Sequence, residues 1–218
     1  MGGNKEIMPK RLSGLLAIIS CLIALLITIP FAASFYRAYG SSEPGLLRPW
    51  LYSMVRTFPN LFDIASPTQV YQVYGRIYSL VIPLSLPALV VLKKQMGIHT
   101  RLSLWSWRIF WSGALLGALG IIGDYWPDPD SIWVGVGFIL ELIGILALWV
   151  GGILYGITAF RERHVPRWIG GAMIGIAPAG ILGLWLLFHI PSGPLLGYVI
   201  FSILIGVPLG NQSKLLGI

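Results

Sequence analysis

Glu141 is the one ionisable side chain inside a long apolar run, residues 131–160. A run of that length can span a bilayer, whose hydrocarbon core takes about 20 helical residues. A charge at mid-membrane costs about 2.5–3.5 kcal/mol or more, so an intramembrane carboxyl usually has a functional or polar partner. Glu141 can relay protons, bind a cation, or make one structural hydrogen bond between helices. The sequence leaves these interpretations open.

Depth along the helices indicates which groups can reach Glu141. The carboxyl lies about ten residues, or roughly 15 Å, from the N-terminal end of its run. Arg76 and His189 belong to the same half of the membrane, whereas Arg108 belongs to the other half. We therefore predict a polar intramembrane cluster of Glu141, Arg76 and His189. The alternative for His189 is an interfacial residue that binds nothing.

Other chemistry has little support in the sequence. Asp124, Asp128 and Asp130 share one short turn, but a calcium site needs about six to eight oxygen ligands and the EF-hand spacing is missing. The single cysteine, Cys21, indicates a small packing residue. The motifs GxxxxGK[ST], HExxH, CxxC and GxSxG are absent. We predict no catalytic residue, no metal and no cofactor.

Membrane helices must position these groups. The chain of 218 residues is 56% hydrophobic and only 11% charged, whereas soluble domains carry about 25% charged residues. The formal net charge of +7 is spread over loops, so we expect no nucleic-acid partner. We predict an all-α fold, a single membrane domain over residues 1–218 that forms a six-transmembrane-helix bundle. The predicted spans are 12–36, 68–92, 103–122, 131–160, 168–190 and 193–210.

Two segments near the N-terminus have alternative interpretations. The run 12–36 follows basic residues and could be a secretory signal, but its length favours an uncleaved first helix because signal cores span about 7–15 residues. The external loop 37–67 is aromatic and apolar. It could lie in the membrane interface or be an ordinary ordered loop.

Glycine and proline spacing predicts how the helices pack and bend. Small residues at steps of four or seven share one helical face and allow close approach in membranes. We therefore predict helix-packing roles for two sets of residues. They are Gly137, Gly144 and Gly151 in the fourth span, and Gly171, Gly175, Ala179 and Gly183 in the fifth. Pro83, Pro87 and Pro178 lie within spans and predict kinks or breaks.

The basic residues predict the orientation. Six spans place both termini on one side, and eleven Lys and Arg residues then fall on that side against four on the other. Basic loops stay in the cytoplasm. We therefore expect both termini in the cytoplasm and the acidic turn outside. The eleven are Lys5, Lys10, Arg11, Lys93, Lys94, Arg101, Arg108, Arg161, Arg163, Arg167 and Lys214.

The C-terminal half resembles small, uncharacterised, multi-spanning bacterial membrane proteins. The residues that carry the resemblance are the run 123–126, GDYW, the glycine-spaced helix after it, and the run 163–168, RHVPRW. The resemblance implies a bacterial cytoplasmic membrane and no particular activity.

Two classes of function follow. The first is a non-enzymatic membrane component, such as an accessory, scaffold, sensory or immunity-type subunit, which the scarcity of polar groups favours. Its partners would be membrane lipid and a membrane protein or a second copy of the chain. The second is a transporter or channel for a small solute, proton or lipid, with Glu141 and the proline-kinked helices along the path. An intramembrane enzyme is a third class, for which no catalytic constellation is present.

Overall fold

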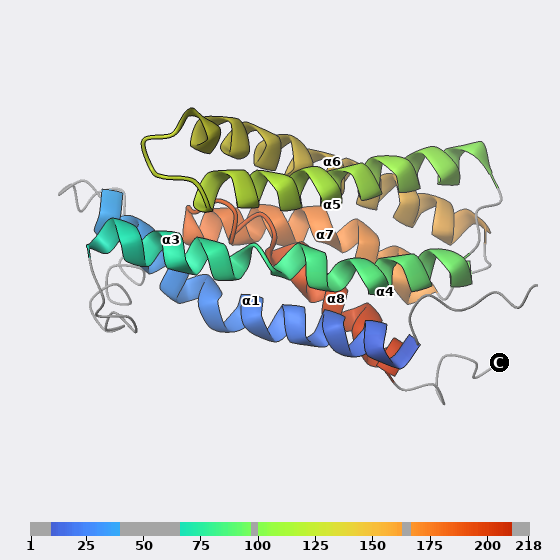
Figure 1. The fold of residues 1–218 in the computed structure, drawn as a ribbon. Coiled ribbons are helices and arrows are strands. Elements are labelled where there is room, and N and C mark those ends of the chain that lie inside the picture. Colours follow the sequence, from blue (N-terminus) through green and yellow to red (C-terminus); the bar gives the residue numbers. More distant parts are fainter. Residues whose placement is uncertain (1–9, 40–65, 97–99, 163–166, 211–218) are drawn as a thin grey trace, which may run out of the picture.

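The protein is an all-α bundle of the polytopic membrane type. The computed structural model describes residues 10–39, 66–96, 100–162 and 167–210. Within these residues the ordered elements are all helices (Figure 1), with no strand among them. The helices are α1 (Lys10–Tyr39), α3 (Pro67–Tyr78), α4 (Val81–Met96), α5 (Arg101–Tyr125), α6 (Ile132–Glu162), α7 (Arg167–Leu187) and α8 (Leu196–Gly210).

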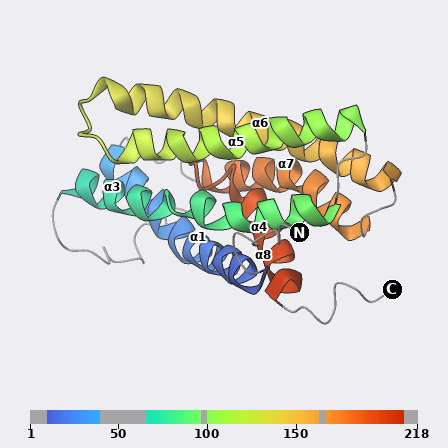
Figure 2. The same ribbon diagram turned by 45° about the vertical axis from the view of Figure 1, so that its right-hand side comes forward.

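The helices run back and forth along one common axis (Figures 1 and 2). The pair α5 and α6 forms one side of the bundle and α1 the other, with α7, α8 and the α3–α4 pair between them. The start of α1 and the end of α8 lie at the same end of the bundle. We call the opposite end, where α1, α5 and α7 finish, the distal end.

Five segments of the described chain are long and apolar enough to cross a membrane: α1, α3 with α4, α5, α6 and α7. The apolar part of α8 is shorter, Leu196–Val207. The predicted external loop 37–67 lies mostly outside the described residues, so the structure tests neither of its two interpretations. Residues 32–34, the small residues at which a secretory signal could be cleaved, are buried inside α1.

The second crossing segment is broken between α3 and α4. Proline removes a backbone donor and its ring clashes with the carbonyl four residues earlier. For Pro83 that carbonyl belongs to Ser79, and the helix is interrupted at Ser79 and Leu80. The break that the sequence predicts is therefore present just before Pro83. The helices continue through Pro87 and Pro178, which lie inside α4 and α7.

Helices α5 and α6 touch backbone to backbone along a row of glycines. A Cβ atom added to Gly144 would lie 2.3 Å from the backbone N of Gly117, and one added to Gly137 would lie 2.3 Å from the N of Asp124. At Gly151 the closest atom would be the N of Phe110, at 2.4 Å. Any side chain would force the helices apart. The three glycines predicted to pack in the fourth span thus lie in this contact.

The predicted small-residue face of α7 needs a correction. Gly183 does meet the connector, since a Cβ there would lie 2.3 Å from the Gly193 carbonyl oxygen. Ala179 is half-buried. A Cβ atom added to Gly171 would be only in ordinary contact range of the Phe160 ring, at 3.8 Å, and one added to Gly175 would meet nothing within 4 Å. The helix is rotated so that a neighbouring face, which includes Gly170, Met173, Ile176, Ala177 and Gly180, meets the bundle.

The connector between α7 and α8, residues 188–195, is not helical, and it is buried except for the exposed Phe188 and the half-buried Ile190. The predicted fifth and sixth spans ended and began inside it, at 190 and 193. Non-helical backbone at membrane depth is tolerated only where protein or water covers it. Here the Tyr36 hydroxyl donates to the carbonyls of Leu187 and Phe188, at 2.9 Å each, and Trp149 Nε1 donates to the Pro194 carbonyl at 3.3 Å. These bonds satisfy backbone carbonyls that would have been paired within the helix if α8 were longer.

Candidate functional site: a tyrosine–histidine network beside a distal pocket

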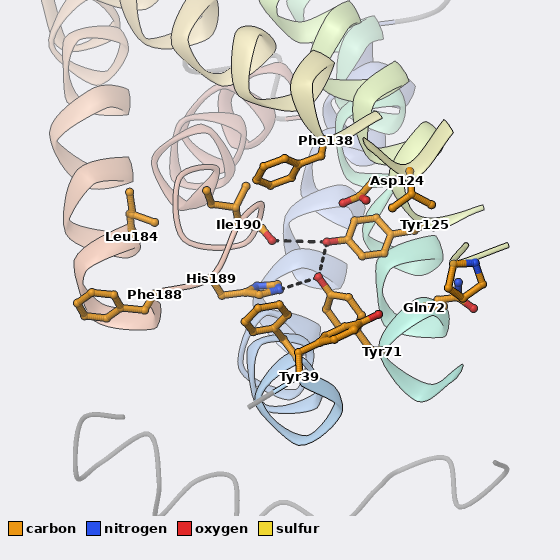
Figure 3. Close-up of a pocket in the computed structure, with 13 residues that line it drawn as sticks. Tyr39, Tyr71, Gln72, Asp124, Tyr125, Phe138, Leu184, Phe188, His189 and Ile190 are labelled. Carbon is orange, nitrogen blue, oxygen red and sulfur yellow. Dashed lines mark hydrogen bonds between the residues drawn. The ribbon is translucent and has the colours of Figure 1, made fainter. Parts of the chain in front are cut away.

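Three side chains from distant parts of the chain form a hydrogen-bonded network at the distal end (Figure 3). The hydroxyls of Tyr71 and Tyr125 lie 2.7 Å apart, and His189 Nε2 lies 3.3 Å from the Tyr71 hydroxyl. Tyr125 also donates to the Ile190 carbonyl at 3.5 Å, and His189 Nδ1 bonds the Ser192 hydroxyl at 2.8 Å. The network therefore ties α3, α5 and the connector together.

Local sequence fixes the position of Tyr71. Ser66 caps α3 by accepting a hydrogen bond from the Gln69 backbone, Gln69 bonds back to the Ser66 backbone, and Pro67 occupies the first turn. Tyr71, Tyr74 and Tyr78 recur on the buried side of this helix. The ring of Phe31 in α1 packs against Tyr71, Tyr78, Tyr125 and His189, with ring centres 4.6–5.4 Å apart. Helix α1 thus forms the floor of the network.

His189 is buried in this network as a neutral imidazole. Burial disfavours the charged form of a histidine, and it lowers the pKa of His189 from its usual 6.5 to about 3. Both ring nitrogens have hydroxyl partners. Because Tyr125 donates to Ile190, the Tyr71 hydroxyl donates to Tyr125 and accepts from His189 Nε2, while the Ser192 hydroxyl donates to Nδ1. His189 is therefore a fixed polar bridge and not a surface group.

Arg76 lies beside the network, and its side chain bonds the backbone of Tyr125. Its Nε donates to the Tyr125 carbonyl at 3.0 Å, and its guanidinium stands over the Trp126 ring at 5.9 Å from the ring centre. This carbonyl is one that the end of α5 leaves without a helical partner. Arg76 therefore caps α5 and holds Tyr125 in place.

Glu141 is buried deeper, with 0% of the residue exposed. Neither of its carboxyl oxygens has a hydrogen-bond partner among the described residues. Its backbone is pressed against Gly120, where an added Cβ would lie 2.3 Å from the Glu141 nitrogen. The side chain lies within electrostatic range of Tyr71, Tyr78, Tyr125 and Asp124. The carboxyl therefore borders the network without bonding to it.

The three residues predicted to cluster, Glu141, Arg76 and His189, all lie around Tyr125. His189 reaches it through Tyr71, Arg76 bonds its carbonyl, and Glu141 lies within electrostatic range. No described hydrogen bond or ion pair joins the three to one another directly. The tyrosines occupy the centre that the prediction gave to the carboxyl.

A pocket of about 540 Å³ adjoins the network at the distal end. Its polar lining residues are Gln72, Asp124 and His189 with the hydroxyls of Tyr39, Tyr71 and Tyr125. Asp124 lies in the last turn of α5 and is half-buried. The remaining walls are apolar and come from α1, α6, α7 and the connector. The pocket therefore offers one carboxyl group and several hydroxyls within a largely aromatic enclosure.

Known proteins add no assignment for this site. Comparisons of the chain with family profiles, with curated proteins and with solved structures give no match. The chemistry of the site must therefore be inferred from its own residues.

Two of the residues that sequence reasoning missed had a signal. Tyr71 and Tyr78 share a buried face in the run YQVYGRIY, at the seven-residue spacing of a single helical stripe. Asp124 was considered only as a metal ligand of the acidic turn. Asp128 and Asp130 are exposed, and no group of three His, Cys, Asp or Glu side chains in the described chain is placed to hold a metal ion.

Proposed function

We propose that this protein is a non-enzymatic membrane component that binds a small molecule in its distal pocket. The pocket itself is the observation that carries the proposal. Its volume of about 540 Å³ falls in the range of small-molecule sites, which is about 300–1,000 Å³. Its walls are largely apolar, with a few convergent polar groups, which is the usual composition of such sites.

The rigidity of the lining supports binding over a purely structural role. Tyr71, Tyr125 and His189 are held by hydrogen bonds to one another, and Phe31 packs beneath them. A ligand would therefore meet side chains that are already ordered, which reduces the entropy that binding costs.

Basic residues favour a pocket that faces the outside of the cell. Eight described Lys and Arg residues lie near the end opposite the pocket, and two, Arg37 and Arg76, lie near the distal end. Basic residues are retained on the cytoplasmic side. The eight are Lys10, Arg11, Lys93, Lys94, Arg101, Arg108, Arg161 and Arg167. We place both termini in the cytoplasm of a bacterial cell and the pocket outside.

Native mass spectrometry of the gently purified protein tests the proposal. Val134→Trp would fill the pocket, because Val134 lines it, whereas Val136 is 39% exposed and lies outside the lining. We expect the native protein and the matched Val136→Trp variant to retain a small molecule that Val134→Trp loses. The same ligand content in all three proteins, or none in the native protein, would contradict the proposal.

A transport function is the second candidate, and Glu141 is the observation that favours it. A buried carboxyl without a partner is costly in a membrane and usually marks a proton or ion path. It borders the network that lines the pocket, next to the broken α3–α4 segment. Proton or solute flux in vesicles that depends on the pocket and is lost in Glu141→Gln would establish this candidate. Flux that is absent, or unchanged in the variant, would exclude it.

The face of α7 around Gly171 and Gly175 is a proposed contact for a second membrane helix. A Cβ atom added to Gly175 would meet nothing within 4 Å in the described chain, and small residues at this spacing allow helices to approach closely. The partner would be another membrane protein or a second copy of the chain. Cysteine crosslinking at Gly171 in native membranes would detect either, and the mass of the crosslinked species would distinguish them.

A further inference from the structure

We propose that the distal pocket binds an organic cation that carries an ammonium group, with Asp124 as its counter-charge and aromatic rings as its walls. This inference rests on the proposed function and names the chemical class of the ligand. It follows from the charge of the lining, from the arrangement of the rings and from the groups that the lining lacks.

The charge of the lining favours a cation. Asp124 is the only acidic residue among the lining residues described, and no lysine or arginine is among them. His189 stays neutral because burial lowers its pKa to about 3. The Asp124 carboxyl is half-buried and lies within hydrogen-bonding range of Tyr125, and no described basic side chain neutralises it. A cation in this pocket would gain a counter-ion, whereas an anion would meet a like charge.

Aromatic rings form the walls around this charge. Six lining residues are aromatic, namely Phe35, Tyr39, Tyr71, Tyr125, Phe138 and Phe188. The Tyr39 and Tyr71 rings are 5.5 Å apart and stand at 83° to each other, and the Tyr71 and Tyr125 rings are 5.3 Å apart at 73°. These are edge-to-face contacts, which fix the orientation of the three rings in the wall of the pocket. Aromatic faces attract ammonium groups electrostatically, and cages of such rings are the usual sites for quaternary ammonium ligands.

Most of the other polar groups of the lining are already engaged, including Gln72, whose Nε2 donates to the Pro127 carbonyl at 3.5 Å. The hydroxyls of Tyr71 and Tyr125 and both nitrogens of His189 bond one another or their neighbours. Arg76, the nearest strong anion-binding group of α3, donates its Nε to the Tyr125 carbonyl and is not part of the lining. A carboxylate or phosphate ligand would therefore lack a positive partner. The Asp124 carboxyl and the Tyr39 hydroxyl are the lining groups that remain for a ligand.

Two sources could supply the ammonium group: a free amine from outside the cell, or the headgroup of a membrane lipid. Tyr39, at 54% exposed, and Phe138, at 40%, lie at the edge of the pocket. Because the distal end is the proposed membrane surface, both sources can reach this edge.

Isothermal titration of the full-length protein in nanodiscs of phosphatidylglycerol, a lipid without an ammonium group, tests the inference. The probes are choline and benzyltrimethylammonium, and each is compared with its neutral isostere, in which a tert-butyl group replaces the trimethylammonium. The shapes are equal, so a difference in affinity reports the charge. We expect each cation to bind about tenfold or more tightly than its isostere. Empty nanodiscs correct for attraction of the cations to the anionic lipid.

Variants locate the charge. Asp124→Asn should remove the preference for the cation, while Asp128→Asn, in the same turn but exposed and outside the lining, should keep it. Should Asp124→Asn fail to fold, Tyr39→Leu provides a second test at an exposed position. It should weaken the cation about threefold or more and leave the neutral isostere unchanged. A preference that survives in both variants would overturn the inference.

The possible outcomes separate the two proposals. Equal binding of cation and isostere would overturn the ammonium inference and leave a small-molecule site in place. No binding of any probe, together with no ligand retained in native mass spectrometry, would overturn both. Replacing half of the lipid by phosphatidylethanolamine distinguishes the sources. Competition by this lipid would support the inference with a lipid headgroup as ligand, and an unchanged affinity would support it with a free amine.

Discussion

The hydroxyl of Tyr71 is the centre of the network, and Tyr71→Phe removes it alone. This hydroxyl bonds the Tyr125 hydroxyl at 2.7 Å and His189 Nε2 at 3.3 Å. In the variant, Tyr125 keeps its bond to the Ile190 carbonyl and His189 keeps its bond to Ser192. The Nε2 of a fully enclosed imidazole is left without a partner. Leaving one buried polar atom unsatisfied costs about 1–3 kcal/mol.

The expected loss is measurable as a lower midpoint of thermal unfolding. For a chain of this size, 1 kcal/mol shifts the midpoint by about 2–4 °C, so Tyr71→Phe should lower it by about 2–12 °C. The assay is thermal denaturation in detergent, followed by tryptophan fluorescence or by the loss of the monodisperse peak in size-exclusion chromatography.

Tyr78→Phe is the matched control on the same helix. Tyr78 is fully buried, and its hydroxyl makes no hydrogen bond of normal geometry with the described residues, although it lies close to the Thr28 hydroxyl. The neighbouring Thr28 donates its own hydroxyl to the Ala24 carbonyl at 2.6 Å. Removing an unpaired hydroxyl should leave stability unchanged or slightly higher. If Tyr78→Phe lowers the unfolding midpoint as much as Tyr71→Phe, or if Tyr71→Phe does not lower it, the hydrogen bonds assigned to the network are wrong.

Three further predictions follow from burial, from packing and from proton linkage. Glu141→Leu should leave the free energy of unfolding unchanged or raise it by about 1 kcal/mol, since it removes a buried carboxyl that has no hydrogen-bond partner among the described residues. A loss of several kcal/mol in denaturant titration would reveal a polar partner. Gly144→Ala should cost about 1–3 kcal/mol because its Cβ would meet the backbone of α5. The control Gly135→Ala, on the same helix where an added Cβ would meet nothing within 4 Å, should gain up to about 1 kcal/mol of helix propensity, and equal effects of the two substitutions on thermal unfolding would contradict the packing. Because the pKa of His189 is about 3 in the folded protein and 6.5 as a free group, the unfolded chain binds the extra proton between these values. The His189 contribution is therefore fully present above pH 6.5 and falls with decreasing pH by up to about 1.4 kcal/mol per unit. The native protein should lose stability from pH 6.5 to pH 4.5 more steeply than His189→Gln. Parallel curves of stability against pH would indicate that His189 is exposed to water in the folded protein.

The distal pocket depends on a departure from regular helix. Connector 188–195 carries His189 and Ile190 into the bundle, and the sequence predicted helical spans that ran up to 190 and resumed at 193. Proline and glycine in the run PSGP indicated a turn there. Their local preference could not show that the turn is buried, because burial depends on the carbonyl acceptors that Tyr36, Trp149 and Tyr125 satisfy from other helices.

The sequence by itself determined the class of the fold. Low charge and long apolar runs require membrane helices, Pro83 interrupts one of them, and the glycine spacing of residues 137–151 allows α5 and α6 to touch. These features depend on local composition and on the period of the helix, which the chain carries residue by residue.

Only the tertiary structure decided which polar groups meet. Tyr71 and Tyr125 are 54 residues apart, and Tyr71 and His189 are 118 apart. Their contact depends on how far each helix is rotated about its axis, and that rotation is set by the side chains of neighbouring helices. The same rotation turned Gly175 away from the bundle and left Glu141 beside the tyrosines instead of bonded to Arg76. A helical period specifies which residues share a face, but the packing of the whole bundle decides where each face points.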